Sequence, residues 1–241
     1  MRKITDMAVE LCEDINYSEE GVTLDIENLG GGIRKVVTHI TSAKGAKKLG
    51  RPKGIYVTIE GLANRGQKEN ISKILSGSIK QFIKESDSPF KKLLIVGLGN
   101  SRFVADSLGP TVCDNLLPNE KIATFKPSVL GATGVASTET IFAITKTVKP
   151  SHVLVVDSLC CHDIDRLGNN FQITNTGITP GSGIGRDNQK IDENFLGVPV
   201  IALGVPMVIY QPSLHYVVPK MVDLVVQECA DIISGAVQQI Y

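Results

Sequence analysis

The stretch LLIVGLGN at residues 93–100 decides the fold of this chain. Its first five residues form an apolar run closed by a glycine, which is typical of a strand buried on both faces of a parallel sheet. Two similar runs follow at residues 152–156 and 198–203, and helical patterns occupy residues 108–117 and 139–148. Strands that alternate with helices predict an α/β fold with a mostly parallel central sheet flanked by helices.

The N-terminal quarter of the chain has a different pattern, with short runs of alternating or β-branched residues separated by glycines. These runs are residues 22–26, 33–40 and 55–59. They predict antiparallel strands, and the apolar spacing at residues 67–85 predicts an amphipathic helix after them. We therefore expect a single α/β domain over residues 1–241, in which a β-rich portion at 1–60 precedes an α/β core at 67–241.

The composition excludes several classes of function. The 241 residues carry 25 Lys and Arg against 25 Asp and Glu, and no basic run indicates a nucleic-acid surface. No apolar stretch approaches the length of a membrane span. Five cysteines are scattered without the spacing of a zinc site, which predicts buried, reduced thiols. We expect a cytoplasmic protein that binds neither nucleic acid nor a membrane.

Two aspartates follow two of the predicted strands. Asp106 opens the helix after residues 93–97, and Asp157 comes directly after residues 152–156. The carboxyl ends of parallel strands form the crevice where ligands bind, so neighbouring strands would place both carboxylates in one cleft. One would then keep a proton as general acid while the other serves as general base for water. Either aspartate alone would be read as a helix or loop cap, and the pair favours catalysis.

Two glycine-rich loops are candidates for the walls of this cleft. Gly97, Gly99 and Asn100 begin like a dinucleotide fingerprint, but Arg102 stands where its third glycine is required, which disfavours that interpretation. The second loop spans residues 176–185. It contains Gly181, Ser182 and Gly183, and its backbone amides form either a nest for a peptide or oxyanion or a plain surface turn.

His162 is the one histidine that follows Asp157 closely. It is a possible third ligand if the two aspartates hold a metal, although an incidental loop histidine is the favoured interpretation. We expect neither a metal nor another cofactor.

Six motifs, in the same order, closely resemble the germination protease family of endospore-forming bacteria. They lie at residues 94–100, 106–110, 129–135, 155–159, 176–185 and 196–206, within a resemblance that runs from about 5 to 208. The resemblance implies a phosphorylase/hydrolase-like fold and an endopeptidase that cuts small acid-soluble spore proteins after an acidic residue. The two aspartates on which the family depends fall on Asp106 and Asp157. It also implies a zymogen, a homo-oligomer and a place inside the forespore.

The segment TDMAVE at residues 5–10 resembles the site at which family members remove their own propeptide. The cut would fall between Asp6 and Met7, near the terminus, where we expect a mobile backbone that a neighbouring subunit can reach. The same residues also suit the start of a short helix capped by Thr5 or Asp6.

Two departures from the family pattern keep other functions open. The chain stops at Tyr241 without the family's C-terminal extension, and its Gly-Ile-Glu-Thr motif reads GVAS at residues 134–137. One alternative is a metal-dependent endopeptidase of the hydrogenase-maturation type, which shares the Gly-x-Gly-Asn start. The other is a non-catalytic relative that binds spore proteins without cutting them.

Overall fold

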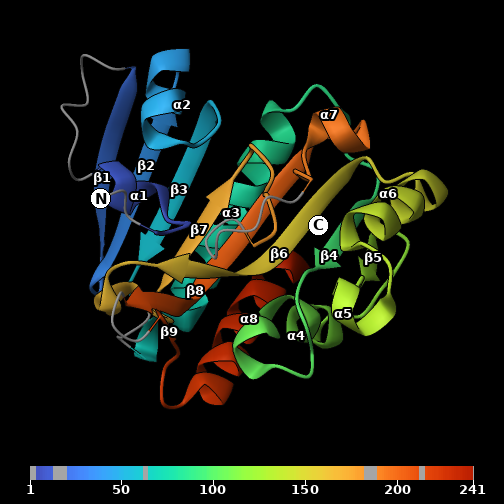
Figure 1. Cartoon of the computed structure of the whole chain (residues 1–241). Coiled ribbons are helices and arrows are strands. Elements are labelled where there is room, and N and C mark those ends of the chain that lie inside the picture. The colour runs from blue at the N-terminus through green and yellow to red at the C-terminus, as the bar shows by residue number, and fades with distance from the viewer. Residues whose placement is uncertain (1–3, 13–20, 62–64, 182–188, 212–214, 241) are drawn as a thin grey trace.

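The computed structural model describes residues 4–12, 21–61, 65–181, 189–211 and 215–240. Within these ranges, nine strands form one continuous sheet in the order β1-β2-β3-β7-β8-β6-β4-β5, and β9 pairs with β8 beside this path. Figure 1 shows the sheet crossing the molecule from the N-terminal strands on one side to β4 and β5 on the other.

The strands are β1 (Val22–Gly30), β2 (Ile33–Ile40), β3 (Gly54–Glu60), β4 (Leu93–Gly97), β5 (Ile122–Phe125), β6 (His152–Cys161), β7 (Asn170–Thr174), β8 (Val200–Gln211) and β9 (His215–Val217). The α-helices are α1 (Ala8–Cys12), α2 (Ala43–Leu49), α3 (Lys68–Glu85), α4 (Leu108–Asn115), α5 (Leu130–Thr133), α6 (Ser137–Val148), α7 (Glu193–Leu196) and α8 (Val222–Gln238). None of these helices is both long and apolar enough to cross a membrane.

The expectation of a mostly parallel sheet is wrong. Strands β8, β6 and β4 are parallel, as predicted, and β5, which was not predicted, joins them in parallel; the other five strand pairings are antiparallel. The prediction missed β7, whose five residues Asn170–Thr174 alternate polar and apolar side chains and are all buried. Because β7 pairs antiparallel with both β3 and β8, it joins the predicted antiparallel N-terminal strands to the parallel strands in a single mixed sheet.

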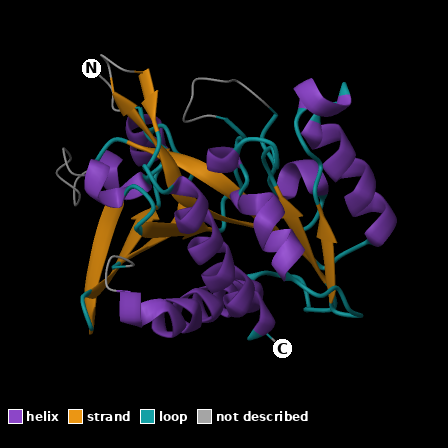
Figure 2. Ribbon diagram, turned by 90° about the horizontal axis from the view of Figure 1, so that it is seen from below, coloured by secondary structure: helices purple, strands orange, loops and turns teal. Residues whose placement is uncertain are grey.

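Helices cover both faces of the sheet, as Figure 2 shows from below. The largest apolar cluster packs α3, α4 and α8 on one face, with Leu75, Val112 and Ile233 fully buried. A second cluster packs α6 and α7 on the other face, around Ile141 and Leu196. Burial on both faces explains why the strands of the parallel part are continuous apolar runs.

Strand β6 continues past the point where its neighbour β4 ends. The last paired residues are Gly97 and Val156, so Asp157 is the first residue of β6 without a partner in β4. The prediction ended this strand before Asp157, whereas the structure extends it to Cys161 alongside a long β8. Asp157 therefore projects from a rigid strand, at the position where the end of β4 leaves one side of that strand open.

Candidate active site

Asp157 is a buried acid, with only 7% of its surface exposed. Burial raises the pKa of its carboxyl group well above the ordinary value, and the nearby charges of Asp106 and Asp6 raise it further. A hydrogen bond of 2.9 Å from the Ser158 N–H to Oδ1 opposes this shift only in part. Asp157 therefore keeps its proton at pH values where an ordinary aspartate is ionised.

Asp106 ends the short 3-10 helix at Val104–Asp106, directly before α4. It is partly exposed, and its charge acts on Asp157. The cap residue of α4 is Ser107, so Asp106 is not the N-cap of that helix. The structure thus brings the two predicted aspartates together, one buried with a raised pKa and the other closer to solvent.

The predicted loop glycines position Asp106. Gly99 has a φ of +116°, and a Cβ atom there would lie 1.9 Å from the backbone oxygen of Asp106. A Cβ atom at Gly97 would lie 2.2 Å from the carbonyl oxygen of Gly109 in α4. The Asn100 N–H donates to the Asp106 carbonyl at 2.9 Å, and its side-chain oxygen accepts from the Arg102 N–H at 3.0 Å. These residues let the loop pack closely on the end of β4.

The second predicted loop is described only at its start. Gly181 is half-buried and has a φ of +73°. Ser182 and Gly183 lie outside the described residues. Their assignment to the cleft remains a prediction.

Asp157, Gly204 and Gln172 form a row of paired residues across strands β6, β8 and β7. Gly204 in β8 pairs with Asp157 on one side and with Gln172 in β7 on the other. Directly paired residues point to the same face of a sheet, so the two polar side chains flank a position that carries no side chain. Sequence reasoning missed Gln172 because it missed β7; the alternating pattern of the sequence NFQIT was the available signal.

The chain's own N-terminal segment lies on this row. The Asp6 N–H donates to the Cys160 carbonyl at 2.7 Å, and the Asp6 carbonyl accepts from Gln172 Nε2 at 3.0 Å. Gln172 Oε1 in turn accepts from the Ala8 N–H at 2.7 Å. The proposed self-cleavage bond between Asp6 and Met7 is therefore held against the sheet, and Met7 is fully buried. The expectation that this bond lies in a mobile terminus is wrong.

The side chain of Asp6 is held from two sides. Its Oδ2 accepts from the Cys160 N–H at 2.9 Å, and its Oδ1 lies 3.4 Å from Arg51 Nη2. The same Arg51 nitrogen donates to the Thr5 carbonyl at 2.6 Å. Arg51 is a second functional candidate that sequence reasoning missed, because nothing in its local sequence places it beside Asp6.

Charged residues hold helix α1, which follows Met7, against the end of β6. Glu10 is buried and accepts hydrogen bonds from the N–H groups of His162 and Asp163 at the end of β6. Arg166 lies 3.6 Å from Glu10 and also pairs with Glu60. Burial alone raises the pKa of Glu60, but a hydrogen bond from Arg34 and the charge of Arg166 lower it overall.

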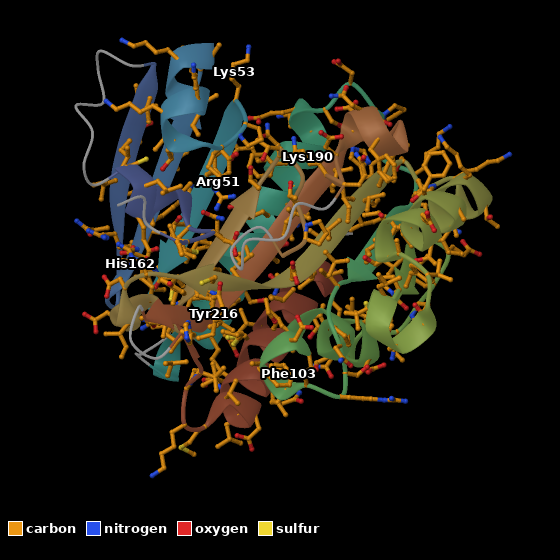
Figure 3. The ribbon with its side chains drawn as sticks, viewed as in Figure 1. Arg51, Lys53, Phe103, His162, Lys190 and Tyr216 are labelled. Carbon is orange, nitrogen blue, oxygen red and sulfur yellow. The ribbon has the colours of Figure 1, made fainter. Side chains whose placement is uncertain are left out.

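His162 does not join the aspartates. Its side chain is exposed five residues beyond Asp157, and Figure 3 shows it near the edge of the molecule rather than beside Arg51. Among the described residues, no group of three His, Cys, Asp or Glu side chains is arranged to hold a metal ion. The metal-dependent alternative thus has no ligand set in this part of the chain.

A protonated buried aspartate paired with a second aspartate is the arrangement that hydrolases use to activate water and protonate a leaving group. The fold is thus α/β, and its candidate site is a buried aspartate with a second aspartate nearby, an arrangement suited to hydrolysis. The sequence model of the germination protease family matches residues 3–228. The chain belongs to the germination protease family, whose members are peptidases.

Individual relatives agree with this assignment. The germination protease of Clostridium tetani is 34% identical over 93% of this chain and 75% of its own length. That of Caldanaerobacter subterraneus is 36% identical, over 85% of this chain and 68% of its own length. That of Priestia megaterium is 33% identical, over 87% of this chain and 64% of its own length.

Proposed function

We propose that this chain is an aspartate-dependent endopeptidase that cuts small acid-soluble proteins inside the forespore, at the bond after an acidic residue. Family membership supports peptidase activity and a role in germination. The observation that carries the aspartate mechanism is the raised pKa of Asp157 beside Asp106. We also propose that the working form is a homo-oligomer without a cofactor.

The two aspartates divide the chemistry of peptide hydrolysis. The more exposed Asp106 takes a proton from water, whose oxygen bonds to the carbonyl carbon of the substrate. Gln172 donates a hydrogen bond to that carbonyl oxygen, as it does to the Asp6 carbonyl here, and stabilises the negative charge that develops on it. The C–N bond then breaks, and Asp157 gives its proton to the leaving amine.

The same site would remove residues 1–6 from its own chain. Asp6 supplies the acidic residue, Met7 the apolar one, and the Asp6 carbonyl already lies on Gln172. The proposed cut leaves Met7 as the new N-terminus and frees the acid-binding contacts for substrate. Intact-mass measurement during incubation at mildly acidic pH tests this step. A mass that stays constant in protein that cleaves peptides would refute self-cleavage and leave the peptidase proposal standing.

A peptide with the sequence of residues 3–10 tests the main proposal. We expect cleavage after its aspartate, at a rate that a chelator does not change. A chelator-sensitive rate would favour the metal-dependent alternative. Binding of a spore protein without any cleavage would favour the non-catalytic alternative.

A further inference from the structure

A pocket lies next to the row of Asp157, Gly204 and Gln172, over the part of the sheet formed by the antiparallel strands β3 and β7. Asp6, Arg51, Tyr56, Thr176 and Lys190 are among its lining residues. Figure 3 shows Arg51 and Lys190 on this part of the molecule, whereas Lys53 lies farther out. The pocket contains two cations and already holds one carboxylate, that of Asp6.

The backbone fixes the direction of Arg51. Helix α2 ends at Gly50, which has a left-handed φ of +65°, and the Arg51 N–H donates back to the Ala46 carbonyl at 3.1 Å. Pro52 follows, and its carbonyl accepts a hydrogen bond of 3.1 Å from the Tyr56 hydroxyl. The hydroxyl of Thr176 donates to the same Tyr56 oxygen at 3.1 Å. The turn at residues 50–52 is therefore held by hydrogen bonds at both ends, and Arg51 lines the pocket from it.

Arg51 also has donor capacity to spare. Its side chain is only 18% exposed, and its Nε atom is buried without a hydrogen-bond partner among the described residues. A desolvated guanidinium is stabilised by a carboxylate that accepts more than one of its hydrogen bonds. The other cation of the pocket is engaged, since Lys190 pairs with Asp192 at 3.0 Å. Arg51 is thus the cation of the pocket that contacts the Asp6 carboxylate, and a substrate carboxylate in the same place would meet its Nη2 atom.

The second contact to the acid comes from the catalytic strand itself. The Cys160 N–H binds Asp6 Oδ2, and Cys160 lies three residues beyond Asp157 on β6. Three residues of strand span about 10 Å. Strand β6 therefore carries both the N–H that binds the acid and Asp157, and the charge of Asp6 acts on Asp157.

We propose that Arg51, together with the Cys160 N–H, is the specificity-determining element that selects an acidic residue before the cleaved bond. This inference rests on the proposed peptidase function. Asp6 occupies these contacts as the acidic residue of a substrate would. A neutral amide in its place keeps one hydrogen bond and loses the charge pairing with Arg51.

The test uses the full chain and two peptides with the sequence of residues 3–10, one with Asp and one with Asn before Met. Arg51→Met removes the charge at similar length, Arg51→Lys keeps the charge without the planar fork, and Lys53→Met removes an exposed cation two residues away. We expect wild type and Lys53→Met to have kcat/KM values about 10- to 100-fold higher for the Asp peptide, the range of a charged hydrogen bond. Intact mass and melting temperature are recorded for each protein.

Arg51→Met should bring this ratio close to one by losing activity on the Asp peptide alone, and Arg51→Lys should lower it at least about threefold. A wild-type ratio in either variant would overturn the assignment of Arg51; the Lys variant keeps this test available if the Met variant does not fold. Equal cleavage of both peptides by wild type would remove the acid subsite and leave the peptidase. Cleavage of neither would refute the proposed function itself.

Discussion

The parallel strands β4, β6 and β8 carry the proposed catalytic Asp157 and the loop that positions Asp106, whereas the antiparallel strands β3 and β7 line the pocket that contains Gln172 and Arg51. The first region resembles many α/β enzymes, in which reacting groups follow the carboxyl ends of strands. The second supplies contacts to the backbone and side chain of a bound segment. The two meet at Gly204, which pairs with both Asp157 and Gln172 and over which the side chain of Leu159 packs. In the proposed mechanism, chemistry and recognition thus come from different parts of one sheet.

The largest effect should follow from removing either aspartate of the parallel region. We expect Asp106→Asn and Asp157→Asn to lower kcat/KM for peptide cleavage by about two to four orders of magnitude, because each loses a proton-transfer group. Asp106→Asn should melt close to wild type and Asp157→Asn no lower than wild type, since Asn is nearly isosteric with Asp. A folded variant with near-normal activity would show that the parallel region does not supply the chemistry.

The antiparallel region should matter next through Gln172. We expect Gln172→Leu to lower kcat by about 100-fold or more, since it removes a donor to the carbonyl that becomes an oxyanion. Gln81→Leu is the matched control; Gln81 lies on α3 and bonds Glu85 one turn away. A kcat equal to that of the control would confine β7 to a structural role.

The loop that positions Asp106 gives a smaller effect. A side chain at Gly99 would collide with the Asp106 backbone and strain a left-handed φ. We expect Gly99→Ala to lower kcat/KM by about 10-fold or more and to destabilise the fold by about 1–3 kcal/mol. Gly77→Ala in α3, where nothing lies within 4 Å, should leave both unchanged or slightly raise stability. Normal activity in Gly99→Ala would mean that the approach of the loop to β4 is not needed.

Stability should depend on pH through Asp157. Its pKa is higher folded than unfolded, so its contribution is fully present below the unfolded value, near 3.8, and is lost as pH rises through the folded value. Asp157→Asn removes this loss, so the variant should gain melting temperature relative to wild type as pH rises above about 4. The melting temperatures of both proteins measured across pH check this. A difference in melting temperature between the two proteins that stays constant with pH would contradict the raised pKa of Asp157.

The smallest effect concerns the cysteines. All five are buried thiols that form no disulfide with one another, as the sequence predicted. Adding a thiol reductant should leave the melting temperature unchanged, which differential scanning calorimetry can show. A clear drop on reduction would indicate a disulfide that this account lacks.

The sequence predicted β4, β6 and β8 of the parallel region but not the short β5, because long apolar runs identify doubly buried strands. It therefore led to both Asp106 and Asp157. It did not predict β7, which is five residues long and buries the amide side chains of Asn170 and Gln172. Such polar residues indicate a loop unless their long-range partners are known.

Arg51 could not be predicted for the same physical reason. It lies 45 residues from Asp6 in the chain and 3.4 Å from it in the fold. The pairing of β3 with β7 brings them together, and that register is a property of the folded sheet rather than of any local pattern. The N-terminal segment was likewise expected to be mobile. Its local sequence does not reveal the contacts that hold it, because Glu10 and the Ala8 N–H bind partners more than 150 residues away.

Mass spectrometry of the cleavage products tests most directly whether the aspartates of the parallel region and the pocket of the antiparallel region act together. A mixture of peptides that differ only in the residue before Met would be incubated with wild type and with Asp157→Asn. The account predicts that wild type cuts the acidic members, on the carboxyl side of the acidic residue, and that the variant produces no fragments. Fragments without an acidic preference, or fragments in the variant sample, would contradict it.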